Sequence, residues 1–205
     1  MATCDNPGRS SWYGFTSNIN EGLIQGMADG LVSSGLDAFG YKLVAIDDGW
    51  AAPRDPTTHE ITADPTLFPH GMAALSAYVT ARNLTFGVYT DRGNLTCLKR
   101  PGSLGYEAVD AQTYAGWGVG FVKEDSCYGE RPAAVDYGVM RDALNATGRH
   151  MAFCVCNPGF GNASYGNQWR TGPDLYSQAS RHGALKGRLA RAPSYAAPLA
   201  CRTTA

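Results

Sequence analysis

Short apolar runs alternate along the chain with longer stretches in which apolar residues recur at helical spacing. The apolar, β-rich runs cover residues 41–48, 84–91, 119–125 and 150–156. The helical patterns between and before them cover residues 20–40, 71–83, 105–118 and 133–148. An alternation of strand and helix at intervals of about 30–45 residues predicts βαβ units and a parallel sheet. Strands buried on both faces of such a sheet are apolar almost throughout, as these runs are.

The first helical pattern carries its own boundary signals. Asn20 stands where a helix cap would accept a backbone hydrogen bond, and Gly40 stands where a helix would end. Between them, apolar residues that we expect on one helix face are Leu23, Met27, Leu31 and Leu36. Two weaker strands are also expected, one near the N-terminus and one at residues 172–176.

Polar side chains follow each apolar run at the point where the predicted strand ends. They are Asp47, Asp48, Asp91, Lys123, Asp125, Cys156 and Asn157. Because the carboxyl ends of parallel strands meet at one edge of a sheet or barrel, these groups are expected to gather into a site. Side chains alternate across a strand, so Lys123 and Asp125 share one face and Glu124 points to the other.

The composition is that of an ordinary globular protein. The chain has 205 residues, of which 44% are hydrophobic and 11% aromatic, with a net charge of -1. We therefore predict no nucleic-acid partner, and no apolar run reaches the length of a membrane-spanning helix. Residues 179–205 differ: they contain eight alanines and five basic residues but no acid, which predicts a disordered or non-homologous tail.

The cysteines and glycosylation motifs bear on the compartment. Six cysteines allow one or two disulfides. Sequons for N-glycosylation occur at Asn83, Asn94, Asn145 and Asn162, which favours a glycoprotein of the secretory pathway. The first residues lack the basic and then apolar pattern of a signal peptide, so none is predicted in this chain.

The available chemistry narrows the class of site. The four histidines have no metal-ligand spacing, no glycine-rich phosphate loop follows the first apolar run, and no Gly-x-Ser-x-Gly motif is present. We therefore predict neither a metal nor a cofactor. Several carboxylates, a lysine, tyrosines and tryptophans remain, and these are the groups that bind and cleave sugars.

Five segments together resemble the α-galactosidases of glycoside hydrolase family 27. They read "SWYGFTSNINE", "GYKLVAIDDGW", "LTFGVYTDRGNLTC", "PGSLGYEAVDAQTYAGWGVGFVKEDSC" and "WRTGPDL". The resemblance implies an α/β fold of the (β/α)₈ barrel type. It extends from about residue 11 to Leu175, so we expect an incomplete, truncated barrel of about six βα units over residues 11–178, without the family's C-terminal β domain.

The resemblance also implies a role for individual residues. Asp125 would be the nucleophile and Asp174 the general acid and base of a retaining mechanism. Residues that would contact the sugar are Trp12, Asp47, Asp48, Tyr89, Lys123, Cys156 and Arg170. Cys97 and Cys127 would form a disulfide, and Lys123 would favour the ionised form of Asp125.

Plainer interpretations stay open at each position. Lys123 and Asp125 could form a structural ion pair, Asp47 or Asp48 could cap a turn, Trp12 and Trp50 could be core aromatics, and Cys97 and Cys127 could be free thiols. The function has alternatives too. The chain could be an inactive fragment that binds sugar weakly, or it could act on N-acetylgalactosamine or arabinopyranose, because "CNPGFG" departs from the family in the loop that contacts the sugar 2-position.

The resemblance implies partners and a location. Substrates would be oligosaccharides, galactomannans or glycolipids that end in α-linked galactose, and a homodimer is compatible with the family. The protein would be secreted, vacuolar or lysosomal.

Overall fold

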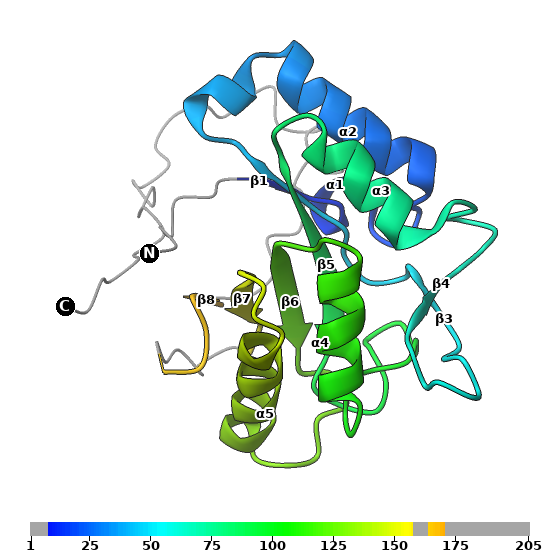
Figure 1. The fold of residues 1–205 in the computed structure, drawn as a ribbon, viewed down its shortest axis with the longest axis vertical. Coiled ribbons are helices and arrows are strands. Elements are labelled where there is room, and N and C mark those ends of the chain that lie inside the picture. Colours follow the sequence, from blue (N-terminus) through cyan, green and yellow to red (C-terminus); the bar gives the residue numbers. More distant parts are fainter. Residues whose placement is uncertain (1–7, 158–163, 171–205) are drawn as a thin grey trace, which may run out of the picture. The chain divides into compact units, whose positions relative to one another are not determined.

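The computed structural model describes residues 8–157 and 164–170, which belong to a compact unit that ends at Pro173. Six parallel strands form its main sheet in the order β1-β2-β5-β6-β7-β8 (Figure 1). Their bounds are β1 (Gly8–Ser10), β2 (Leu43–Ala45), β5 (Thr85–Asp91), β6 (Phe121–Asp125), β7 (Ala152–Val155) and β8 (Gln168–Trp169). The strand order follows the chain order, as in one part of a (β/α)₈ barrel, and this confirms the predicted fold class.

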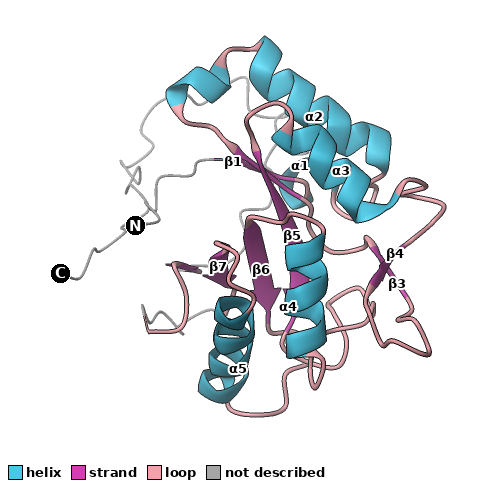
Figure 2. Cartoon of the chain, viewed as in Figure 1, coloured by secondary structure: helices cyan, strands magenta, loops and turns pink. Residues whose placement is uncertain are grey.

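Helices connect the successive strands of the main sheet from β1 to β7. The helices are α1 (Trp12–Phe15), α2 (Glu21–Ser33), the 3₁₀ helix η1 (Leu36–Phe39), α3 (Gly71–Thr80), α4 (Glu107–Gly116) and α5 (Ala133–Ala146). Right-handed crossovers between strands that always advance in one direction place the long helices on a single face of the sheet (Figure 2). Among the described helices, none combines the length and apolarity needed to cross a membrane.

The helix predicted over residues 20–40 is divided in two. Asn20 caps α2 as predicted, because its side chain accepts a hydrogen bond of 2.9 Å from the Leu23 backbone N–H. The helix ends at Ser33, since Gly35 adopts a left-handed conformation with φ 72°, and η1 then runs to Gly40. Met27 and Leu31 are buried as expected, together with Ile24 and Ala28, whereas Leu23 and Leu36 lie at the margin of the core.

The weakest predicted elements needed correction. β8 at Gln168–Trp169 was not predicted, and the strand expected at residues 172–176 lies outside the described part of the chain. A two-stranded antiparallel sheet was not predicted. It pairs β3 (Ala51–Ala52) with β4 (Thr62–Ala63) and follows directly after Trp50. Strands of two residues carry no periodicity from which they could have been recognised.

The two faces of the sheet are packed differently. The main apolar core lies between the sheet and the helices and includes Phe86, Val88 and Val122. On the other face, Phe121 forms a smaller cluster with Leu43 and Ala45. Gly87 makes this second packing possible, because a Cβ atom there would lie 2.8 Å from the Phe121 ring. This second face corresponds to the interior of a barrel, and the polar side chains lie at the carboxyl ends of its strands.

Candidate active site

The polar side chains predicted at strand ends do meet at one edge of the sheet. Strand register places Tyr89 beside Lys123, and Asp91 beside Asp125. The remaining described candidates follow the carboxyl ends of their strands: Trp12 after β1, Asp47 and Asp48 after β2, Cys156 after β7 and Arg170 after β8. Asp174, the expected general acid, lies outside the described residues.

Lys123 reaches across the sheet to Asp47. Its Nζ atom lies 2.8 Å from Asp47 Oδ2 and 5.0 Å from the centre of the intervening Tyr89 ring. Burial lowers the pKa of Lys123, but Asp47 and other nearby acids outweigh it, so the net pKa is raised and the ammonium stays charged. The ion-pair partner of Lys123 is therefore Asp47, which the plain interpretation of a Lys123–Asp125 pair did not foresee.

Asp125 is partly exposed and has both carboxylate oxygens oriented. Its Oδ2 accepts a hydrogen bond of 3.1 Å from the Tyr89 hydroxyl, and its Oδ1 accepts one of 2.9 Å from the Ser126 backbone N–H. Hydrogen bonds to the ionised form stabilise a carboxylate, and two of them from different elements fix its direction. Asp125 thus combines a held orientation with access to solvent.

Tyr89 supports this carboxylate from the neighbouring strand. Burial, together with the negative charge of Asp125 and nearby acids, raises the pKa of the Tyr89 hydroxyl far above its usual range. The hydroxyl therefore remains a proton donor. Tyr89 is 2% exposed, and its backbone carbonyl accepts a 2.9 Å hydrogen bond from the indole N–H of Trp50. Trp50, also 2% exposed, is a core aromatic rather than a pocket wall.

Asp48 holds a neighbouring loop. Its carboxylate accepts hydrogen bonds of 2.8 Å from the Thr96 hydroxyl and 2.8 Å from the Leu98 backbone N–H, both in the loop after β5. Burial is the main influence on this group and raises the pKa of Asp48. The adjacent Asp47 instead meets Lys123 and the Ser10 hydroxyl. The two consecutive aspartates therefore have different roles. Asp47 belongs to the row of polar side chains at the strand ends, which we call the rim, and Asp48 anchors the loop after β5.

A disulfide joins the loops that follow β5 and β6. Cys97 and Cys127 are bonded, with their Cα atoms 5.1 Å apart, which confirms the pairing that the resemblance implied. Asp91 reinforces the link by accepting a 2.7 Å hydrogen bond from the Cys127 backbone N–H. The cysteine sulfurs and the carboxylates of Asp91 and Asp125 all lie within 4.8 Å of one another. Sulfurs in a disulfide are not thiolate ligands, so this cluster does not fit a metal site.

Cys156 lies at the far side of the rim. Burial raises the pKa of its thiol to about 11, so the thiol is neutral near pH 7. The Arg170 guanidinium approaches it, with Nη1 3.8 Å from the Cys156 sulfur. Trp12, in α1, is partly exposed at the opposite end of the row of strands.

Two contributors to the rim were missed from the sequence. The Ser10 hydroxyl donates a 3.2 Å hydrogen bond to Asp47, and the Thr96 hydroxyl donates to Asp48. Ser10 ends β1, the weak first strand, so the rule that polar residues at strand ends face the site would have included it. Thr96 lies within a loop, where no periodic pattern indicates which way a side chain points.

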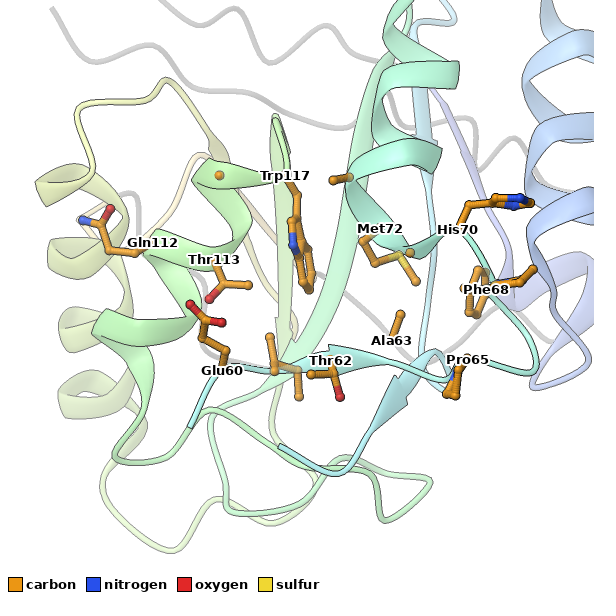
Figure 3. Close-up of a pocket in the computed structure, with 15 residues that line it drawn as sticks. Glu60, Thr62, Ala63, Pro65, Phe68, His70, Met72, Gln112, Thr113 and Trp117 are labelled. Atoms are coloured by element: carbon orange, nitrogen blue, oxygen red, sulfur yellow. The ribbon is translucent and has the colours of Figure 1, made fainter. Parts of the chain in front are cut away.

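A groove of about 740 Å³ lies away from these residues, on the side of α3 and α4 (Figure 3). Trp117, Met72 and Phe68 line it, and Glu60 and Thr62 come from the segment around β4. None of the predicted site residues lines this groove. The rim at the strand ends, rather than the groove, therefore gathers the candidate chemistry.

The chain is similar in sequence to known proteins. The sequence model of the family described as alpha galactosidase A matches residues 13–172. The chain is 47% identical over 182 residues to a Dictyostelium discoideum protein named "Probable alpha-galactosidase". That alignment covers 85% of this chain and 47% of the relative.

Solved structures are similar too. Alpha-galactosidase I from Mortierella vinacea superposes with a TM-score of 0.78 at 34% identity, over 83% of this chain and 48% of that one. An α-galactosidase from Saccharomyces cerevisiae, solved with raffinose, gives a TM-score of 0.77 at 33% identity, over 81% of this chain and 39% of that one. The chain thus spans about half the length, or less, of the relatives that it matches.

Proposed function

Since this chain belongs to the alpha galactosidase A family, whose sequence model matches residues 13–172, we propose that it carries the sugar-cleaving site of a retaining α-galactosidase. The reaction is hydrolysis of a terminal α-linked galactose by double displacement. Substrates are α-galactosides of the kind represented by raffinose, with which the yeast relative was solved. Oligosaccharides, galactomannans and glycolipids all present such an end.

The observation that carries the proposal is the setting of Asp125. Its carboxylate lies at the carboxyl end of β6, is held by Tyr89 and Ser126, and is partly exposed. A glycosidase nucleophile must be ionised, must point in one direction and must be reachable by the anomeric carbon. The Lys123–Asp47 ion pair across the same rim supplies charged groups suited to the hydroxyls of a sugar.

In the proposed mechanism, a carboxylate oxygen of Asp125 attacks the anomeric carbon and the bond to the leaving oxygen breaks. Asp174 gives its proton to that oxygen, then removes a proton from the water that releases galactose from Asp125. The Tyr89 hydroxyl keeps Asp125 aimed during both steps, since burial prevents this tyrosine from losing its proton.

The proposed sugar contacts come from several strands. Asp47 and Lys123 bind hydroxyl groups from β2 and β6, and Arg170 and Cys156 bound the pocket beyond β7. Trp12 offers a partly exposed aromatic face for the apolar side of the ring. Asp48 acts chiefly through the loop that it anchors.

We also propose passage through the secretory pathway. The Cys97–Cys127 disulfide is characteristic of oxidising compartments. The sequon asparagines Asn83, Asn94 and Asn145 are all exposed, as glycan attachment requires, while Asn162 lies outside the described residues. Deglycosylation of protein made in a eukaryotic host tests this, since an unchanged mass would contradict it.

Hydrolysis of an aryl α-galactoside by the purified chain tests the main proposal. Asp125→Asn is expected to lower kcat by at least about 1,000-fold, because an amide cannot form the glycosyl ester. The matched control is Asp142→Asn, an exposed aspartate on α5 that should leave the rate unchanged. Aryl β-L-arabinopyranoside and α-N-acetylgalactosaminide in the same assay distinguish the two alternative specificities.

An inactive fragment would give another pattern. It would melt broadly or precipitate on heating, bind galactose at most weakly by calorimetry, and release no aryl group from any of the three substrates. Equal rates for wild type and Asp125→Asn would also overturn the proposal, because the residual hydrolysis would then come from elsewhere.

A further inference from the structure

Glu124 is an ionisable residue that the proposed mechanism does not use. It lies in β6 between Lys123 and Asp125, and its side chain points to the opposite face, toward the helices. It is 0% exposed. Neither carboxyl oxygen has a hydrogen-bond partner among the described residues. A buried carboxylate without a partner is costly, so the group is expected to hold a proton.

Arg92 acts on Glu124 through its charge but makes no hydrogen bond to it, because its donors are engaged elsewhere. Arg92 donates from Nη1 to Asp136 and to the Arg131 carbonyl, each at 2.7 Å. Its Nε donates to the Ser126 hydroxyl at 2.8 Å, and its Nη2 donates to the Gly129 carbonyl at 3.2 Å. The guanidinium is thereby committed to the loop after β6 and to α5.

The other charged groups around Glu124 come from three elements and are mainly acidic. From β5 and its loop come Asp91 and Arg92, from α4 comes Glu107, and from the region of α5 come Arg131, Asp136 and Tyr137. Val155, its register neighbour on β7, is uncharged. Burial first, and then Glu107, Asp91 and Asp136, raise the pKa of Glu124 well above its usual value, while Arg92 opposes them.

We propose that Glu124 is a positioning residue that keeps the end of β6, and with it Asp125, in place only while its carboxyl group is protonated. This inference rests on the proposed function, since it concerns regulation of the same site. Asp125 follows Glu124 directly, and their shared backbone determines whether Asp125 can meet the Tyr89 hydroxyl at 3.1 Å. Ionisation of Glu124 would draw water or a cation into the layer between β6 and the helices.

The direction of the pH dependence follows from linkage. Because the folded state raises the pKa of Glu124, the folded protein binds more protons than the unfolded chain above the ordinary glutamate pKa. The contribution of Glu124 to stability is therefore fully present in acid and is lost as the pH rises toward the folded-state pKa. The site is thus suited to acidic surroundings.

Thermal unfolding from pH 4.5 to 9 tests the first half of the proposal, with no need for activity. Wild type is expected to lose stability toward alkaline pH. Glu124→Gln keeps the size of the side chain but cannot ionise. Between acid pH and pH 8–9, the Tm of wild type should therefore fall by at least about 4 °C more than the Tm of Glu124→Gln. Glu60→Gln, an exposed glutamate in the segment before β4, is the matched control and should follow wild type.

The rim around Asp125 tests the second half by two measurements. One is the rate at which a phosphine reduces Cys97–Cys127, followed by mass spectrometry. This rate reports on Asp125 because the Tyr89 hydroxyl lies 3.1 Å from Asp125 and 3.2 Å from the Cys97 sulfur. Between pH 5 and 8, the reduction rate of wild type should rise by a factor that exceeds the corresponding factor for Glu124→Gln by more than about fivefold. The other is the pH profile of α-galactoside hydrolysis, whose alkaline limb should shift upward in Glu124→Gln.

The outcomes separate this inference from the proposed function. If no variant hydrolyses the substrate but unfolding and reduction behave as expected, the proposed function fails and the positioning role of Glu124 stands. Parallel pH curves for wild type and Glu124→Gln in unfolding and reduction would overturn the inference. Should Glu124→Gln fail to fold, Glu124→Met, an uncharged side chain suited to an apolar layer, gives the same comparison.

Discussion

The two faces of β6 treat ionisable residues in opposite ways. On the inner face, Lys123 pairs with Asp47, which follows β2, and Asp125 accepts hydrogen bonds from Tyr89 of β5 and from the Ser126 backbone. On the outer face, Glu124 is buried beneath the helices and has no hydrogen-bond partner among the residues that the structure describes. The three residues are consecutive, so sequence position alone does not decide their charge. The supply of partners from neighbouring elements does.

The outer layer is not closed to charge in general. Arg92 and Asp136 form an ion pair of 2.7 Å with side chains 8% and 1% exposed, and Arg54 forms a bidentate pair with Asp110. Buried charges persist there when each finds its opposite. Glu124 is a buried acid without a hydrogen-bond partner among the described residues, so the two faces differ in whether their acids are paired.

The outer ion pair offers the largest test of this comparison. Arg92→Met removes one of the two arginines that pair with the buried Asp136, the other being Arg131, together with four donated hydrogen bonds, so the free energy of unfolding should fall by about 3–5 kcal/mol. Urea denaturation measures the loss. Adding Asp136→Leu to Arg92→Met should restore part of the stability, because the buried carboxylate that has lost one of its two arginines is then absent. A loss below about 1 kcal/mol would show that the Arg92–Asp136 pair contributes little to the stability of the outer layer.

The inner ion pair should matter less for stability and more for sugar. Lys123→Met leaves Asp47 unpaired, but Lys123 is 23% exposed, so solvent limits the loss to about 2 kcal/mol. In the proposed enzyme, kcat/KM should fall about 10- to 100-fold, as expected for losing a charged hydrogen bond. The exposed Lys99→Met serves as control. An unchanged kcat/KM would remove Lys123 from the sugar contacts.

A surface pair gives the smallest effect and calibrates the other two. Lys42 and Asp37 lie 3.4 Å apart with side chains 31% and 25% exposed. Lys42→Met should change the free energy of unfolding by less than about 1 kcal/mol in the same urea experiment. A loss as large as that of Arg92→Met would mean that burial does not govern these pairs.

The strands with strong apolar runs were predictable from the sequence, whereas the shortest ones were not. β5 and β6 coincide with runs identified by composition alone. β3, β4 and β8 have two residues each and are defined by pairing rather than by any local pattern. Gly35 was the signal for the break after α2, but an unbroken apolar spacing toward Leu36 obscured it.

Residues at the site were easier to predict than their partners. The rule that polar residues end parallel strands identified Asp47 and Lys123 separately, and the structure joins them across 76 positions of sequence. Asp47 follows β2 and Lys123 lies on β6, and β5 separates these strands, so Lys123 reaches Asp47 over the Tyr89 ring of β5. Likewise, Glu124 has no hydrogen-bond partner among the described residues, and the donors of the nearby Arg92 are bound elsewhere. Competition of this kind is a property of the assembled fold.

Because Cys97 and Cys127 form a disulfide, the activity measured for a preparation depends on whether the protein was made under oxidising conditions. It ties the loop that reaches Asp48 to the strand end that presents Asp125. Protein produced in a reducing cytosol would lack this tie, and both loops would move independently beside the sugar site. A lack of hydrolysis by such material would reflect the reduced state of Cys97 and Cys127 rather than the catalytic competence of the chain.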